Sequence, residues 1–318
     1  MVDNPNNSYT YPNLSDDPDH RDVLRNKFGI RSHEELKTEE YRETAMRMAE
    51  IAEGLGPQGT FDKDHLKAIH HHIFQDVYEW AGHMRNERPL VDGAQVETIG
   101  TLRKGDTMFL PGSRLDMGLN EALKPLADLD RLKETTPAEF ADVAGRVMAD
   151  LNYVHPFREG NGRTQEAFIE ELGRACGHDV DFTVITQGRM IEASIAVTSD
   201  PDHPAMRNMI EDATDPNRCA ALRAAIADLE RLGADPDDYY VCTARPGEEI
   251  TGKILAHDDH VASIVTGPRL VVVDAIDLPE KLPARAEVLT ITAHSDFSGL
   301  ADVSELAERI SSARHPRG

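Results

Sequence analysis

Basic residues are scarce in this sequence relative to acidic ones. Lysine and arginine total 34 against 57 aspartates and glutamates, so the formal net charge is −23 over 318 residues. A surface this acidic repels the phosphate backbone of nucleic acids and the anionic face of membranes. The composition therefore argues against either partner, and adaptation to salt or simple solubility would produce the same excess of acids.

Cysteine is also rare, and long apolar runs are absent. Cys176, Cys219 and Cys242 are odd in number and widely spaced, which argues against a disulfide framework. No run of 18 apolar residues occurs, and the N-terminus is rich in Asp, Asn and Pro instead of carrying a basic and apolar signal. We expect a soluble protein made in the cytoplasm.

Two common phosphate-binding patterns, GxxxxGK[ST] and GxGxxG, are missing as well. His70, His71 and His72 invite a metal interpretation. Consecutive side chains on a helix, however, point about 100° apart and do not converge on one ion. We therefore predict no metal site here and interpret the three as chance histidines on a partly exposed helix.

The most informative segment runs from His155 to Arg163, with the sequence HPFREGNGR. Apolar residues at helical spacing precede it over residues 140–151 and follow it over residues 168–172. The segment is therefore predicted to be the loop of a helix–loop–helix unit.

The residue types in this loop suit phosphate chemistry. Gly160 and Gly162 let successive N–H groups face one point at a helix N-terminus, which favours an anion. Arg163 can donate two hydrogen bonds to phosphate oxygens. Glu159 would repel phosphate unless Mg²⁺ lay between them, and His155 can accept a proton near pH 7. A plain turn with a helix cap, a surface histidine and a Glu–Arg pair is the alternative interpretation of the same residues.

The segment resembles the Fic family motif HPFx[D/E]GNGRxxR, which it matches from His155 through Arg163. Residues 66–82 are similar to the helix and turn that precede the family's docking flap. Residues 206–208 and 215–216 resemble the end of the Fic core in Bartonella effector proteins and their toxin-like relatives. The resemblance covers roughly residues 20–220 and implies a mainly α fold.

The resemblance also implies an activity and its residues. AMP would pass from Mg·ATP to a Tyr, Ser or Thr hydroxyl of a target protein, with ATP as substrate and Mg²⁺ as cofactor. His155 would be the catalytic base and Glu159 the metal ligand. The implied nucleotide-binding residues are Phe157, Gly160, Asn161, Gly162 and Arg163.

One motif position departs from the family pattern, because Glu166 stands where the family has its second arginine. Two unit charges about 5 Å apart at an effective dielectric near 20 interact by roughly 3 kcal/mol before screening. Glu166 also follows Arg163 by three residues and can pair with it on a helix. Weaker use of ATP, a different nucleotide donor, or a binding and scaffold module without transfer are the three alternatives.

Regulation and location follow from the same resemblance. The family's inhibitory helix carries [ST]xxxE[GN], and this sequence has no such match, so a separate antitoxin chain or a loss of regulation is implied. Translocation into a host or recipient cell is the alternative to a purely cytoplasmic location.

The region between Trp80 and Leu123 is broken by Gly and Pro and predicts a hairpin over residues 96–110. In the family the matching hairpin docks the target by strand addition, and an ordinary surface hairpin is the alternative. The residues assigned to this flap are Lys104, Gly105, Asp106, Thr107, Met108 and Phe109.

The C-terminal part changes to five short β-rich runs between residues 239 and 292, which suggest a small closed barrel. Its position resembles the oligonucleotide/oligosaccharide-binding-fold segment of Bartonella effectors, and we interpret it as a structural spacer. The predicted organisation is a loosely ordered segment over 1–20, a helical Fic core with a β-hairpin flap over 21–233, an OB-like barrel over 238–293, and a helical extension over 294–318.

Overall fold

The computed structural model describes residues 8–283 and 287–298, and it is mostly helical. These residues divide into two compact units. The first unit comprises the chain up to residue 134 together with residues 146–177, and the second comprises residues 135–145 and the chain from residue 178 on. Within the described ranges, no helix is long and apolar enough to cross a membrane.

Five helices supply the first unit, and one of them, α4, also contributes residues to the second. They are α1 (His33–Ala52), α2 (Lys63–Phe74), α3 (Leu115–Leu123), α4 (Pro137–Val154) and α5 (Asn161–Cys176). The predicted helix–loop–helix unit is confirmed as α4 and α5 with the loop 155–160 between them.

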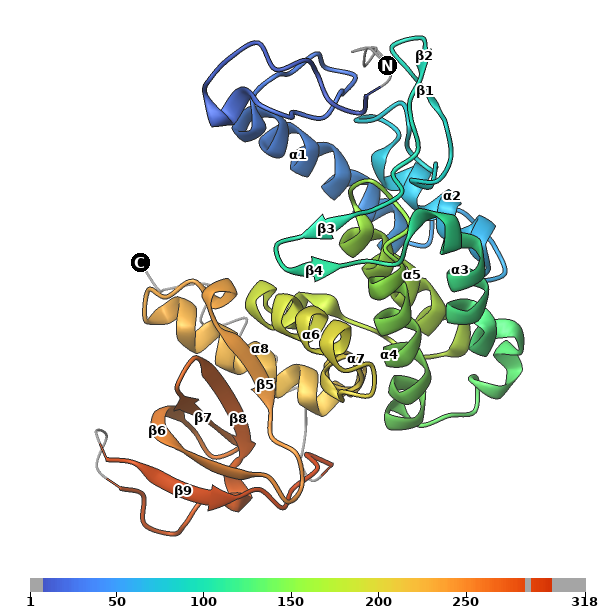
Figure 1. Ribbon diagram of the computed structural model, residues 1–318. Helices are drawn as coiled ribbons and strands as arrows, with labels where there is room; N and C mark the ends of the chain where they lie inside the picture. Colours follow the sequence, from blue (N-terminus) through green and yellow to red (C-terminus); the bar gives the residue numbers. More distant parts are fainter. Residues whose placement is uncertain (1–7, 284–286, 299–318) are drawn as a thin grey trace. The chain divides into compact units, whose positions relative to one another are not determined.

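Side-chain caps and an apolar stripe define these helices. Ser32 caps α1, and Asp62 caps α2 by accepting a hydrogen bond from the backbone N–H of His65 at 2.9 Å. In Figure 1, α1, α2 and α5 cross one another, and their contacts bury one face of α2. The His65 ring lies in this interface, where its Nε2 is 3.1 Å from a carboxylate oxygen of Glu171.

Two short hairpins connect α2 to α3. The first pairs β1 (Leu90–Val91) with β2 (Ala94–Gln95), and the second pairs β3 (Arg103–Lys104) with β4 (Thr107–Met108). The hairpin predicted over 96–110 is observed as the second of these. Short 3-10 turns occur at Pro18–His20, Gly112–Arg114, Lys124–Ala127, Leu129–Arg131, Phe182–Val184, Pro236–Asp238 and Ala275–Asp277.

The second unit combines three helices with one sheet. The helices are α6 (Gln187–Ser199), α7 (Ala205–Thr214) and α8 (Pro216–Arg231). The strands are β5 (Tyr240–Thr243), β6 (Glu249–His257), β7 (Val261–Thr266), β8 (Arg269–Asp274) and β9 (Leu289–Thr292). The five predicted strands are therefore confirmed.

The sheet order is β5-β8-β7-β6-β9, with β5 parallel to β8 and the other pairs antiparallel. The strands β5 and β9 are the two edges, and no pairing joins them among the described residues, so the structure shows the predicted five strands but does not show the closure into a barrel. Buried residues of α8, such as Leu222 and Leu229, pack with Val241 and Leu270 of the sheet. Figure 1 shows α8 running along this face.

A buried charge cluster ties the helices of the second unit to β5. Asp212 on α7 is fully buried, and its carboxylate lies 2.8 Å from nitrogens of both Arg189 and Arg245. It also lies 3.6 Å from Arg218 Nη1 and accepts a hydrogen bond from the Thr243 hydroxyl at 2.6 Å. Despite burial, these arginines lower the pKa of Asp212 to about 2.

The ends of the predicted organisation are only partly described. Tyr9 is buried, and its ring meets that of Trp80 edge-on at 5.7 Å. Residues 294–298 contain no helix, and the rest of the predicted helical extension, 299–318, lies outside the described residues, as do residues 1–7.

Candidate active site

His155 follows the last turn of α4 in a left-handed backbone conformation, with φ 48°. Its N–H still donates to the Leu151 carbonyl at 2.9 Å, so the residue closes the helix while turning the chain into the loop. The imidazole stacks on Phe109, which follows β4, with ring centroids 3.8 Å apart. The predicted base and the predicted flap are thus in direct contact.

Burial lowers the pKa of the His155 imidazole to about 4, and the nearby positive charges of Lys104 and Arg85 act in the same direction. The ring is therefore neutral at pH 7. Its Nδ1 lies 3.3 Å from the Asn152 carbonyl oxygen. Because a carbonyl only accepts, Nδ1 carries the hydrogen and Nε2 holds the free lone pair, which is the arrangement that a general base needs.

Gly160 is the N-cap residue directly before α5 and adopts the left-handed region, with φ 80°. A Cβ there would lie 2.2 Å from Cζ of Phe74, so backbone and space both require glycine. Gly162 has no such neighbour within 4 Å. The α5 N-terminus therefore begins with a close approach to α2, and Gly162 in its first turn is exposed.

Replacing Gly160 by alanine is expected to destabilise the first unit by about 2–5 kcal/mol, from roughly 1–2 kcal/mol of backbone strain and roughly 1–3 kcal/mol of overpacking. Gly177→Ala is the matched control, because Gly177 ends the same helix at φ 84° with nothing within 4 Å. Urea unfolding followed by fluorescence of Trp80, the single tryptophan, measures both. Equal losses would contradict the contact with Phe74.

Asn161 holds the loop through both ends of its amide. Its Oδ1 accepts from the Phe157 N–H at 2.9 Å, and its Nδ2 donates to the Phe157 carbonyl at 3.0 Å. The side chain is buried. Asn161 thus fixes the shape of the loop in the described geometry, and this positions Phe157 against α2.

His70 is a functional neighbour that sequence reasoning missed. It is fully buried, stacks on Phe157 at 3.9 Å, donates from Nε2 to the Glu159 carbonyl at 3.1 Å, and accepts at Nδ1 from the Gly82 N–H at 2.8 Å. Burial lowers its pKa to about 3, so it is neutral. The prediction of a chance histidine was wrong for His70. Its helical spacing with Leu66, Ile69 and Ile73 could have placed it on the apolar face.

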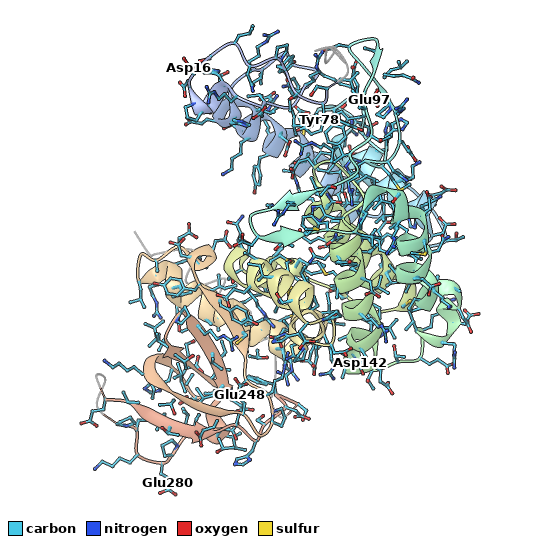
Figure 2. All side chains as sticks on the ribbon, viewed as in Figure 1. Asp16, Tyr78, Glu97, Asp142, Glu248 and Glu280 are labelled. Atoms are coloured by element: carbon cyan, nitrogen blue, oxygen red, sulfur yellow. The ribbon has the colours of Figure 1, made fainter. Side chains whose placement is uncertain are left out.

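Arg163 is already paired. Its guanidinium forms an ion pair with Glu40 of α1, donates to the Thr44 hydroxyl at 2.8 Å and lies 4.7 Å over the Phe74 ring. The Tyr78 hydroxyl, on a residue labelled in Figure 2, donates to the same Glu40. The group that the sequence assigns to phosphate is thus oriented by a half-buried carboxylate from α1.

Glu166 forms no ion pair with Arg163 in the described part of the chain, so the pairing considered from sequence gives way to Glu40. Glu166 is half-buried in α5, and burial raises the pKa of its carboxyl. Its carboxyl remains near Arg163, whose positive charge opposes that rise. The site therefore places two carboxylates about one arginine.

The Glu159 carboxylate is exposed at the start of α5, where Oε1 accepts from the Gly160 N–H at 3.1 Å. No group of three or more potential metal ligands occurs within residues 8–283 and 287–298. A single exposed carboxylate such as that of Glu159 fits Mg²⁺, because this ion is commonly held by one or two carboxylates together with substrate phosphates.

The predicted flap residues differ in their exposure to solvent. Lys104, Gly105 and Asp106 are exposed at the turn of the hairpin, and Thr107 is half-buried. Met108 is 53% exposed, while Phe109 is buried against His155. The hairpin therefore presents an exposed two-stranded edge above the imidazole.

A neutral histidine, a glycine-shaped helix N-terminus and an exposed hairpin meet at the loop 155–160 of this mostly helical protein. The Fic/DOC family model matches residues 60–172. The chain is 37% identical over 174 residues to a probable protein adenylyltransferase of Sinorhizobium fredii, covering 54% of this chain and 82% of that protein. The chain therefore belongs to the Fic/DOC family.

Other relatives extend the comparison. A protein adenylyltransferase of Bartonella henselae is 33% identical over 246 residues, which are 77% of this chain but 44% of that protein, so the chain spans less than half its length. The solved structure of the type IV secretion system effector protein BepA superposes with a TM-score of 0.78 at 28% identity, covering 90% of this chain and 96% of that one. The BepC protein of Bartonella tribocorum, solved with bound AMPPNP, matches with a TM-score of 0.59 at 31% identity over 65% of this chain and 96% of that one.

Proposed function

We propose that this protein is an adenylyltransferase that moves AMP from ATP to a hydroxyl side chain of a target protein. The observation that carries the proposal is the neutral His155, with Nε2 free, between a glycine-shaped helix N-terminus and an exposed hairpin edge. The names of the relatives, protein adenylyltransferase, support it.

The residues would divide the work as follows. His155 Nε2 accepts the proton of the target hydroxyl as its oxygen attacks the α-phosphorus. The bond to the oxygen that bridges the α- and β-phosphates breaks, and diphosphate leaves. Backbone N–H groups at the start of α5, together with Arg163, bind the phosphate oxygens, while Asn161 and His70 keep the loop in shape.

Glu159 is the residue that would hold Mg²⁺ in this scheme. When bound, the ion would neutralise negative charge on the phosphates. Glu159 suits this role because its carboxylate is exposed and its backbone carbonyl is fixed by His70.

The test is transfer of radioactive phosphate from ATP to proteins of a lysate, with Mg²⁺ present. Label placed on the α-phosphate is expected to appear on protein, whereas label placed on the γ-phosphate is expected to stay in solution as diphosphate. Protein labelling from the γ-position alone would replace AMP transfer by phosphorylation, and labelling from neither would reject the proposal.

A second candidate, a binding module without transfer, is favoured by one observation. Glu40 and Glu166 surround the phosphate-binding Arg163, so the terminal phosphates of ATP meet more negative than positive charge. A pull-down of target that survives without diphosphate release would support this module.

Changing Glu166 to arginine separates these alternatives. Each unit charge about 5 Å from a phosphate changes the interaction by roughly 3 kcal/mol before screening, so after screening we expect the KM for ATP to fall at least about tenfold. Glu121→Arg is the matched control, because it makes the same charge change on the exposed surface of α3. An unchanged KM in Glu166→Arg would remove Glu166 from the nucleotide site.

The finer assignments extend the same proposal. The hairpin residues 104–109 would dock the target by adding its backbone to an edge, and a separate antitoxin chain would supply the inhibitory helix. The C-terminal sheet would act as a spacer of OB-like type within the predicted boundaries 238–293. The likeness to type IV secretion effectors supports translocation into a recipient cell.

A further inference from the structure

Arg85 is a buried cation that the proposed reaction does not use. Its residue is 0% exposed, and no acidic side chain pairs with it within the described ranges. Burial lowers the pKa of its guanidinium. A buried charge without a counter-ion is costly unless its donors are satisfied, so the contacts of Arg85 show what offsets that cost.

Four carbonyl oxygens satisfy the guanidinium. Nε donates to the His155 carbonyl at 2.8 Å, and Nη2 donates to that of Val154 at 3.3 Å. Nη1 donates to the Ile99 carbonyl at 3.1 Å, and Nη2 also donates to that of Leu110. The first two carbonyls belong to the C-terminus of α4, where unpaired carbonyls carry partial negative charge.

The other two carbonyls lie at the two ends of the hairpin segment 99–110. The Arg85 backbone also joins the loop to the hairpin segment. Its N–H donates to the Pro156 carbonyl at 2.8 Å, and its carbonyl accepts from the Ile99 N–H at 2.7 Å. The Leu110 N–H donates to the Tyr153 carbonyl at 3.0 Å. Both ends of the hairpin are therefore held to the residues that carry the imidazole.

We propose that Arg85 is a positioning residue that couples the target-docking hairpin to the His155 base. Its side chain fixes the backbone of His155 and both ends of the segment 99–110 at once, so a target strand added to the hairpin is registered against Nε2. The catalytic half of this inference rests on the proposed function. The structural half of the inference, that one guanidinium holds the hairpin to the loop, is independent of the proposed function.

Arginine is required by this geometry. The planar guanidinium has five donors and reaches carbonyls in two directions, whereas a lysine ammonium donates from one point. Arg85→Lys keeps the charge and loses the bridge. Arg174→Lys is the matched control, because Arg174 also donates to two helix C-terminal carbonyls, those of Ile51 and Ala52, at 3.1 and 3.0 Å.

The catalytic measurement is AMP transfer at saturating and limiting ATP. A misplacement of about 1 Å costs on the order of 100-fold in rate, so kcat is expected to fall about that much in Arg85→Lys. The KM for ATP should change less than about threefold, because ground-state binding is not touched. Arg174→Lys should match the unmodified protein. A loss confined to KM in Arg85→Lys would overturn the positioning role.

The mechanical measurement is independent of activity. Trypsin cleavage after Arg103 and Lys104 should accelerate at least about tenfold in Arg85→Lys and stay unchanged in Arg174→Lys, since cleavage follows local opening. If the unmodified protein transfers no AMP, the proposed function fails. The cleavage result still decides whether Arg85 holds the hairpin segment 99–110 to the loop. Equal cleavage rates in the two variants would contradict the role of Arg85 in holding the hairpin.

Amide hydrogen exchange of the unmodified protein covers the case in which Arg85→Lys does not fold. The N–H groups of Ile99, Leu110 and His155 are expected to open together and exchange with the same protection, because one side chain holds all three segments. Protection at His155 that exceeds that at Ile99 and Leu110 more than about tenfold would overturn the coupling.

Discussion

Replacing His155 by alanine is expected to lower AMP transfer on the order of 10²–10⁴-fold, the usual contribution of a positioned general base. The KM for ATP should stay close to that of the unmodified protein, because the imidazole faces the hairpin and stacks on Phe109. Transfer of α-phosphate label, measured against equilibrium binding of ATP, gives both quantities. Full transfer by the variant would reject His155 as the base.

The pH dependence is part of the same prediction. The base form of His155 is neutral, and its pKa is lowered to about 4, so transfer should stay level between about pH 5 and 8 and decline only as pH falls through about 4. A decline centred near the ordinary histidine pKa of about 6.5 would mean that the ring is solvated during turnover.

Replacing Asp212 by asparagine is expected to destabilise the protein by about 3–5 kcal/mol, because Arg189, Arg218 and Arg245 are left around a neutral group. Asparagine keeps the shape of the side chain and an acceptor for Thr243, so the decrease in the free energy of unfolding measures the effect of the lost negative charge. Urea unfolding followed by far-UV circular dichroism measures it.

The control is Asp142→Asn, which breaks an exposed ion pair with Arg207 and should cost no more than about 1 kcal/mol. Figure 2 labels Asp142 on the surface. The pKa of Asp212 is lowered from 3.8 to about 2, so its stabilising effect is complete above about pH 4 and is lost as pH falls through about 2. Losses of the same size in both variants would contradict the buried cluster.

Local sequence patterns predicted much of the fold and located the loop of the candidate site. Apolar spacing identified the helices on both sides of residues 155–160, and alternating runs identified the five strands. The HPFREGNGR segment identified the loop because its chemistry lies within nine consecutive residues. The parallel pairing of β5 with β8 was not predictable, because no local pattern records which distant strand is the neighbour.

The supporting residues of the site were missed for a related reason. His70 contacts Glu159 across 89 residues, Arg85 contacts His155 across 70, and Glu40 contacts Arg163 across 123. Each is an ordinary helix or turn residue until the chain is folded. Tertiary contact, and not local preference, gives these side chains their roles.

A histidine with a pKa of about 4 also limits how this protein can be controlled. Both histidines beside the loop, His155 and His70, keep one protonation state across the pH range of living cells. Acidification of a compartment therefore provides no switch through these two side chains. Under the proposed function, control would depend on what is bound: the nucleotide in the loop, the polypeptide along the hairpin, or a separate chain that covers one of them.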